Sequence, residues 1–550
     1  FKGPAGYLNG INPLAGVVNL VRKQTLPHGL ASFGIGWGSF HTTEASFDLN
    51  AASAEGRTSF RLNGLWRESD GYRDGRDYSV SAIHPVFAWR PNERKALTVS
   101  LELSSSDYRP DAGLPLLAGV LPDVPRERSY ASPLDQSRQD IARIQVDYEV
   151  VINERFTVRN KLYSRELDWD TRGTLISGVL DFGTGPQVLR VLLDLDDRQN
   201  LFGNQLELLW RTDRHQLLAG IELMRSTDDF SLDVGFLPVI DLFVPVETPG
   251  ATPIPIPGQA SSGDSETTIV APYFVDQIRL SDRARLMLGA RFDSIDFDDR
   301  LSGLSRSDSE ISPLVGLVFE VKPETWIYAN VARSFAPASV RVAGERQPEK
   351  SRQFEIGLRR DLAGGRLHTI LAAYQLERDN IAIPDDNGFT QQAGDQRSRG
   401  LEAELGGEFG KGLVGTLSYA YNEAELIRFA ELVQLPFPPF FAVLDRSGNT
   451  PAFAPEHLFR AWLSRTFDSG LGVAGGLRWV DSQFIAEDNV AEIDGHALLD
   501  AAVYYGLDRW RVSLNLKNLT DKEYGTRGFG SFSVIPGQPF SATVRIEYRM

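Results

Sequence analysis

The sequence contains no cysteine, and none of its apolar runs approaches 18 residues in length. Without cysteine the chain has no disulfides, no thiolate metal sites and no cysteine nucleophile. A transmembrane helix needs about 20 mostly apolar residues, so the missing runs exclude such a helix. They do not exclude a transmembrane β-barrel, because barrel strands alternate apolar and polar residues and never produce a long run.

Positively charged residues are outnumbered by acidic ones. The chain has 57 Lys and Arg against 73 Asp and Glu, a formal net charge of -16. Nucleic-acid binding needs a basic patch, so we expect no nucleic-acid partner. The seven histidines are scattered without metal-ligand spacing, and neither a phosphate loop nor a nucleophile elbow occurs. We therefore expect no enzyme activity, no metal site and no cofactor.

The main signal present is strict alternation of apolar and polar residues. In residues 141–150 the even positions are apolar and the odd positions from 143 onward are charged or polar. Residues 510–517 and 542–549 repeat this pattern. A period of two places alternate side chains on opposite faces, which predicts β-strands. A soluble β-sandwich and a membrane barrel would both alternate in this way.

The spacing of turns and the strand lengths favour the barrel. Strands of about ten residues exceed the usual length of about five or six. We count ten short turns, near residues 55, 91, 153, 212, 281, 322, 364, 410, 469 and 507, separated by longer polar segments such as 104–139, 166–200, 226–268 and 422–455. Ten turns joining strand pairs, with the first and last strands added, predict 22 strands and eleven long loops. An even strand number with short turns on one side is typical of bacterial outer-membrane barrels.

Tryptophans flank many of these strands, which is consistent with the aromatic girdles of a membrane barrel: Trp66, Trp89, Trp210, Trp326, Trp479 and Trp510. Buried sandwich tryptophans are the alternative. A barrel of about 22 strands encloses a lumen too wide for its own side chains to fill, and such barrels are plugged. Residues 1–26, with their glycines and prolines followed by the apolar run 17–21, are the segment available for that position.

Four passages of the sequence resemble the TonB-dependent outer-membrane receptors, and among them the siderophore receptors. The first, KGP at 2–4 with YLNG at 7–10 and GVVNLV at 16–21, is similar to the closing segment of the family's plug domain. The others are similar to signatures of the barrel: PEKS at 348–351 with FEIGL at 354–358, RSRGLEAE at 397–404, and NLTDKEY at 518–524. Their order along the chain matches that of the family.

The resemblance implies an all-β fold: residues 30–550 form a 22-stranded antiparallel outer-membrane β-barrel, and residues 1–29 are the C-terminal remnant of a plug domain. The coupling box that TonB grips would then lie before Phe1. The implied function is TonB-energised import of a ferric siderophore or a similar scarce, large ligand across the bacterial outer membrane. The implied partners are the inner-membrane TonB complex, outer-membrane lipid and lipopolysaccharide, and the ligand.

Two alternatives stay open at this point. The receptor could take a ligand other than iron chelates, such as a cobalamin, a glycan or an aromatic compound. The chain could also be a structural or assembly subunit that kept the barrel and lost transport.

In this family a basic residue just before the Gly-Pro of the plug docks against glutamates of the inner barrel wall. By resemblance this assigns Lys2 to a plug–barrel contact with Glu355 and Glu402. Alternation agrees, because the apolar neighbours Phe354 and Ile356 should face lipid and so turn Glu355 inward. The alternative is that these acids only line a wet lumen.

Two further sets of residues are weaker candidates. Phe437, Phe440 and Phe441 form an apolar cluster in a long loop that could grip a ligand, although bracing of neighbouring loops is the favoured interpretation. The acidic runs at 194–197 and 293–299 could hold calcium or bridge lipopolysaccharide. They lack calcium-loop spacing, which favours solvated loop charge.

Overall fold

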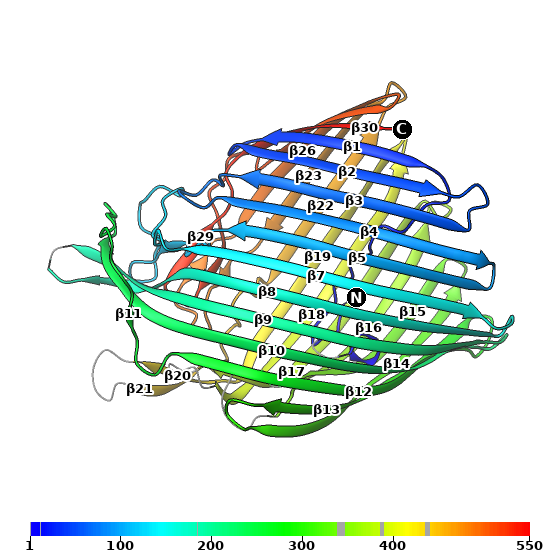
Figure 1. Cartoon of the computed structure of the whole chain (residues 1–550), viewed down its shortest axis with the longest axis horizontal. Helices are drawn as coiled ribbons and strands as arrows, with labels where there is room; N and C mark the ends of the chain where they lie inside the picture. The colour runs from blue at the N-terminus through cyan, green and yellow to red at the C-terminus, as the bar shows by residue number, and fades with distance from the viewer. Residues whose placement is uncertain (1, 11–12, 184, 338–346, 385–389, 435–440) are drawn as a thin grey trace.

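The computed structural model describes residues 2–10, 13–183, 185–337, 347–384, 390–434 and 441–550. These residues form one large antiparallel sheet that closes into a barrel (Figure 1). The barrel strands are β1 (Leu30–Gly38), β2 (Thr42–Ala52), β3 (Thr58–Ser69), β4 (Tyr78–Asn92), β5 (Lys95–Tyr108), β7 (Gln136–Val151), β8 (Phe156–Asp181), β9 (Pro186–Arg211), β10 (His215–Asp241), β12 (Ser261–Arg279), β13 (Ala284–Asp299), β14 (Ser305–Lys322), β15 (Thr325–Ala336), β16 (Glu349–Leu362), β17 (Leu367–Pro384), β18 (Thr390–Gly410), β19 (Leu413–Arg428), β22 (His457–Thr466), β23 (Leu471–Val480), β26 (His496–Leu507), β27 (Trp510–Lys517) and β30 (Ser541–Arg549).

Each barrel strand pairs with the barrel strand that follows it along the chain, and the last strand returns to the first. β30 pairs with β1 in the antiparallel register that sets Ile546 opposite Ile35, and it pairs with β27 on its other side. The ring therefore has no free edge, which satisfies the backbone hydrogen bonds that lipid cannot. The predicted closed barrel of 22 strands is confirmed.

The connections differ between the two ends of the barrel. At one end ten tight turns join the strands, as predicted, and the turn between β18 and β19 contains only residues 411 and 412. The other end carries the longer connections and the short additional strands β6 (Leu114–Pro115), β11 (Ile254–Pro255), β20 (Ala430–Gln434), β21 (Phe441–Asp445), β24 (Gln483–Phe484), β25 (Glu492–Ile493), β28 (Gly525–Phe529) and β29 (Ser533–Pro536). Several of these lie at the left of Figure 1.

The predicted long loop at 166–200 and the first part of the one at 226–268 are instead extended strands. Residues 166–200 belong almost entirely to β8 and β9, which are joined by residues 182–185, and β10 continues to Asp241. At 27 residues, β10 would be roughly 90 Å long, far more than a bilayer requires. The expectation failed because the inner face of these extensions does not meet water: Ile176, Val188 and Ile240 pack with the connection after β5, so the alternation of a membrane strand is lost while backbone pairing continues. One of the eleven predicted long loops would join β1 to β2. This prediction is also wrong, because residues 39–41 alone connect the two strands.

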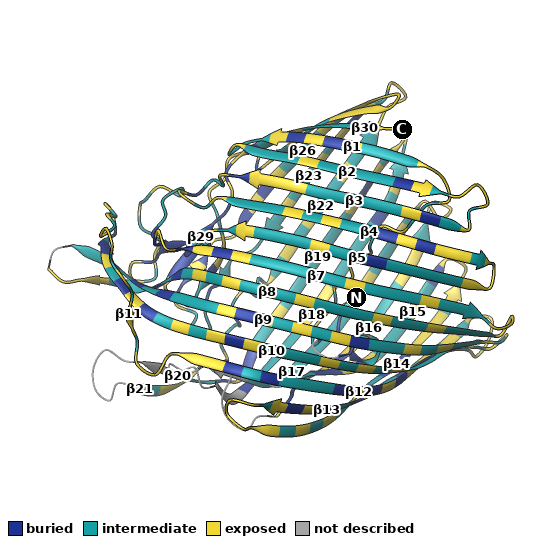
Figure 2. Ribbon diagram, in the orientation of Figure 1, coloured by how far each residue is buried: buried dark blue, intermediate teal, exposed yellow. Residues whose placement is uncertain are grey.

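The outer surface is apolar, the reverse of a soluble protein. On β1 the side chains of Phe33, Ile35 and Trp37 are 45–49 % exposed, whereas Gly34 and Gly36 between them are buried. Burial alternates in the same way along many strands (Figure 2). This inverted pattern fits an outer face in contact with lipid.

The described residues contain a single α-helix, α1 (Gly6–Asn9). No helix in these parts of the chain has the length and apolar character needed to span a membrane.

Candidate functional site

The N-terminal segment, residues 2–10 and 13–28, runs through the interior of the barrel (Figure 1). Its first part folds back on itself, because Gly3 N–H donates to the Ala15 carbonyl over 2.8 Å and Ala5 N–H donates to the Pro13 carbonyl over 3.2 Å. α1 lies against β12, β13, β14 and β15. Residues 22–28 contact β2, β3, β5 and β7 on the other side of the ring. The segment therefore crosses the lumen.

Lys2 forms an ion pair with the inner wall. Its Nζ lies 2.5 Å from Glu402 Oε2 on β18, and the Lys2 side chain is 68 % exposed. Glu355 on β16 instead accepts a hydrogen bond from Gln353 over 2.9 Å. Of the two predicted partners, the structure brings Glu402 to Lys2. Whether this pair holds a plug in place is a matter of function, and that assignment stays a prediction.

Glycines let the segment approach the wall closely. A β-carbon built on Gly6 would lie 2.6 Å from the Ser334 hydroxyl oxygen, and one built on Gly3 would lie 2.6 Å from the Gln353 amide nitrogen. Gly3 also has a φ of 83°, which side chains rarely adopt. No larger residue fits at either position without displacing the wall or the segment.

Arg291 on β13 is the buried charge beneath the segment. It is 2 % exposed, and its guanidinium lies 2.8 Å from Glu222 and 2.8 Å from Asp293. It also lies over the ring of Tyr273, 5.6 Å from the ring centroid, and its Nη2 would be 3.3 Å from a β-carbon on Gly10. Because a buried charge is costly without partners, the two carboxylates fix this arginine in place.

The second half of the segment is attached through basic residues. Arg22 donates to Gln145 on β7 over 3.1 Å and lies 3.6 Å from Glu102 on β5. Lys23 pairs with Asp48 on β2 over 2.8 Å. Cationic residues of the segment thus meet acids of the wall on both sides of the lumen.

Asn50 on β2 secures the point where the segment enters the barrel wall. Its side-chain oxygen accepts the Leu26 N–H over 2.9 Å, and its side-chain nitrogen donates to the carbonyls of Leu26 and His28 over 3.0 and 2.5 Å. Asn50 is 6 % exposed. Its side chain thus satisfies backbone groups of Leu26 and His28 that lie before the first strand of the sheet.

The candidate ligand residues of the sequence cannot be placed. Phe437 and Phe440 lie outside the described residues, and of Phe441 only the backbone, in β21, is described. The proposed roles of this cluster stay predictions.

Sequence reasoning missed Arg22 and the buried serines of the wall. Arg22 directly follows the apolar run 17–21 and could have been suspected, since wall acids had been expected to meet a basic residue. Serines such as Ser312 and Ser334, 0 % and 3 % exposed, carry no signal of their own. Only the position of α1 singles them out.

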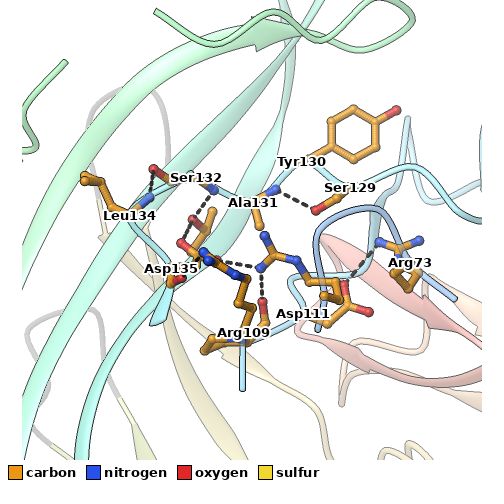
Figure 3. Close-up of polar contacts among 12 residues, drawn as sticks. Arg73, Arg109, Asp111, Ser129, Tyr130, Ala131, Ser132, Leu134 and Asp135 are labelled. Atoms are coloured by element: carbon orange, nitrogen blue, oxygen red, sulfur yellow. Dashed lines mark hydrogen bonds and ion pairs between the residues drawn. The ribbon is translucent and has the colours of Figure 1, made fainter. Parts of the chain in front are cut away.

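The long connection after β5, residues 109–135, is anchored at the other end of the barrel by buried polar contacts (Figure 3). Arg73, 3 % exposed, donates to Asp111 over 3.1 Å and to the Gly113 carbonyl over 2.9 Å. Asp135, fully buried, accepts from the Thr174 hydroxyl over 2.6 Å. These bonds fix the loop against the extended strand β8.

Two carboxyl groups of this region have shifted pKa values of opposite sign. Burial raises the pKa of Asp135, against the opposing effects of the Thr174 hydroxyl and the Arg76 guanidinium. The Phe540 N–H and the Arg126 guanidinium hold the pKa of Asp521 below its usual value. Asp521 and Arg126, 2.8 Å apart, link the loop after β27 to the loop after β5.

The same loops also share an apolar core. Leu116 packs with Ile485, Ile493 and Val534, which come from the connections after β23 and β27. Backbone pairing adds β6 to β29, with Leu114 opposite Val534. Loops that are distant in sequence thus form one connected layer at this end. In the described parts of the chain, no three His, Asp or Glu side chains are grouped closely enough to hold a metal ion.

A closed ring of 22 antiparallel strands with an apolar outer face and a segment of the chain docked in its lumen defines a plugged outer-membrane β-barrel. Residues 86–519 match the family described as TonB dependent receptor-like, beta-barrel. The chain belongs to this family, and its place is the bacterial outer membrane.

Individual relatives agree with the family. The chain is 27 % identical over 572 residues to the metal-pseudopaline receptor CntO of Pseudomonas aeruginosa, covering 99 % of this chain and 79 % of the relative. It is 25 % identical over 602 residues to the ferrichrome outer membrane transporter/phage receptor of Escherichia coli, covering 100 % and 78 %. The crystal structure of the siderophore receptor PiuA from Acinetobacter baumannii has the same fold, with a TM-score of 0.90, 19 % identity, and coverage of 100 % and 85 %.

Proposed function

We propose that this receptor imports a ferric siderophore or a similar large metal chelate through the outer membrane, with energy supplied through TonB. The observation that carries the proposal is the N-terminal segment docked across the lumen by ionic contacts to both sides of the wall. A lumen of this width needs a gate, because an open one would pass small solutes. The barrel supplies the hydrogen-bonded wall, and catalysis has no part in the process.

The ligand class is supported by the relatives. The names of similar proteins specify receptors for metal-pseudopaline, ferrichrome and ferrioxamine. These relatives share 24–27 % identity with the chain over at least 95 % of its length. The proposal extends this shared class, large metal chelates, to the present receptor.

We further propose that residues 1–29 belong to the gate and residues 30–550 to the barrel. In this scheme Lys2 and Glu402 form a contact between gate and barrel, exposed to water and easily broken. Glu355 lies on β16, which β17 separates from β18, and it would offer Lys2 a second carboxylate as the segment moves.

The test is uptake of radioactive iron by a strain lacking this receptor, given a panel of purified ferric siderophores under iron limitation. We expect the deletion to abolish uptake of at least one chelate, and the wild-type gene to restore it. Collapse of the proton gradient should abolish uptake and leave surface binding intact. Unchanged uptake of every chelate, in a strain stripped of other iron receptors, would contradict the proposal and favour a structural role.

A further inference from the structure

The wall beneath α1 carries a row of buried serines. Ser312 on β14, Ser334 on β15 and Ser351 on β16 are 0 %, 3 % and 2 % exposed. Ser334 and Ser351 face each other across neighbouring strands, and Ser312 is opposite Arg291 on β13. Ser312 and Ser334 both lie within 3 Å of a β-carbon built on Gly6. Residues of the segment therefore cover Ser312 and Ser334, and Ser351 continues the row on the next strand.

The three hydroxyls are not used by the docked segment. Within the described parts of the chain, none of the three has a hydrogen-bond partner. A buried polar group left unpaired costs free energy that an apolar group of the same shape does not. A wall surface that stayed permanently covered would be better built from alanine or valine. The hydroxyls are favourable only when water or another polar partner reaches them.

Residues 2–10 make contacts with the wall that can be broken easily. They present Gly3 and Gly6 to the wall, so no side chain of these residues inserts between the strands. The ionic contact of residues 2–10, between Lys2 and Glu402, is exposed to water, and water weakens such pairs. Residues 2–10 belong to none of the buried apolar clusters of the described chain, although Ala5 among them is only 3 % exposed.

The arginines beside the row already have carboxylate partners within the wall. Arg291 is held by Glu222 and Asp293, and Arg378, opposite Ser351, is paired with Glu349. The uncovered surface would thus offer hydroxyls beside arginines that are not free to bind an anion. A path for transport must bind its cargo weakly enough to release it, and neutral hydroxyls meet that requirement better than free charges.

We propose that Ser312, Ser334 and Ser351 line the path that opens along β14 to β16 when residues 2–10 leave the wall. The cargo such a row would guide is hydrophilic and rich in oxygen, a chelate whose outer surface carries hydroxyl, amide or carboxylate groups. This inference rests on the proposed transport function for its cargo. The position of the path does not depend on the cargo, because it is inferred from the buried serines of the wall.

The path is testable by single introduced cysteines, because none of these 550 residues is a cysteine. In energised cells given the imported chelate, we expect Ser334→Cys to react with a membrane-impermeant methanethiosulfonate reagent added outside. Without chelate, or after collapse of the proton gradient, it should be protected. The matched control is Ser100→Cys, also a buried wall serine at 6 % exposure but one that accepts a hydrogen bond from Arg22. Protection of Ser334→Cys during measured uptake, or equal reaction at both positions, would overturn the proposal.

A second measurement does not depend on the cargo. Gly6→Val should push the segment off the row, because its side chain would collide with Ser334 and Ser312. In planar bilayers we expect this variant to conduct ions, and the added Ser334→Cys to lose most of that current when the reagent is applied. Current that the reagent leaves unchanged would overturn the path even if uptake is established. Failure of every chelate to be imported, with the current blocked, would refute only the proposed cargo.

Discussion

Two charged contacts, one between the N-terminal segment and the wall and one within the wall, differ in how far water reaches them. The Lys2–Glu402 pair is exposed to the water of the lumen, with side-chain exposures of 68 % and 26 %. Arg291 is 2 % exposed and shared between Glu222 and Asp293. Water screens the first pair, whereas removal of the buried cation would leave two carboxylates facing each other.

We predict that Arg291→Met destabilises the folded barrel by about 3–5 kcal/mol, because it leaves buried charges uncompensated. Lys2→Met should change the stability of the barrel by about 1 kcal/mol or less. Thermal unfolding in detergent, followed by circular dichroism, measures both. Equal losses in the two variants would show that burial is not what distinguishes these contacts.

Among the strand pairs of the barrel, tyrosines that face the lumen recur directly opposite glycines. Tyr374 on β17 faces Gly400 on β18, and Tyr273 on β12 faces Gly220 on β10. A β-carbon on Gly400 would lie 2.5 Å from the Tyr374 ring, and one on Gly220 would lie 2.7 Å from the Tyr273 ring. Each ring thus occupies the space that a side chain would fill on the next strand, which strengthens the strand pair.

Gly400→Val should expel the Tyr374 ring and lower stability by about 1–3 kcal/mol. The matched control is Gly475→Val on β23, where the nearest atom to a β-carbon is 3.9 Å away. The temperature at which the compact band unfolds on a denaturing gel provides the measurement. A lower unfolding temperature in the control than in Gly400→Val would rule out the ring as the cause.

The loops after β5 and β27 are joined by Arg126 and Asp521, and this link should depend on pH. The Phe540 N–H and Arg126 lower the pKa of Asp521, so the carboxylate is the form that the folded loops favour. Its contribution is fully present above the ordinary aspartate pKa and is lost as the pH falls through the lowered value.

Spin labels on Asp123→Cys and Glu523→Cys report the distance between these two loops. We expect one short distance at pH 7 that persists to about pH 4 and broadens only below it. In an Asp521→Asn background the distribution at pH 7 should already be broader than in the unaltered background and should not broaden further at low pH, while the β6–β29 pairing still holds the loops together. Broadening between pH 7 and 5 in the unaltered background would mean that another group controls the link.

Taken as a whole, the barrel must have one orientation in the membrane, with its short turns toward the periplasm. We predict that a membrane-impermeant thiol reagent labels Thr252→Cys, in the long connection after β10, on intact cells. Glu154→Cys, in the turn after β7, should react only after the outer membrane is opened. Both residues are exposed, so accessibility of the side chain does not decide the result. The reverse labelling pattern would invert the assignment.

Much of this architecture could be predicted from short-range features. The alternation of apolar and polar residues predicted the membrane strands, and the ten tight turns predicted that there are 22 of them. The extensions of β8, β9 and β10 beyond the membrane could not be found in the same way. There one face packs on the connection after β5, through Ile176, Val188 and Ile240, instead of meeting water, so the lipid-and-water alternation of the membrane strands no longer applies while the backbone ladder continues.

The sequence by itself determined that the chain forms a closed barrel with an apolar outside, because lipid on one face and water on the other impose a period of two. It also determined that Glu355 and Glu402 face inward. Only the tertiary structure decided that Lys2 meets Glu402, that Arg291 is buried between two acids, and that Gly6 covers unpaired serines. The Lys2 and Gly6 contacts join residues more than 300 positions apart, Arg291 meets Glu222 from another strand, and the geometry of all three depends on the curvature and register of the ring.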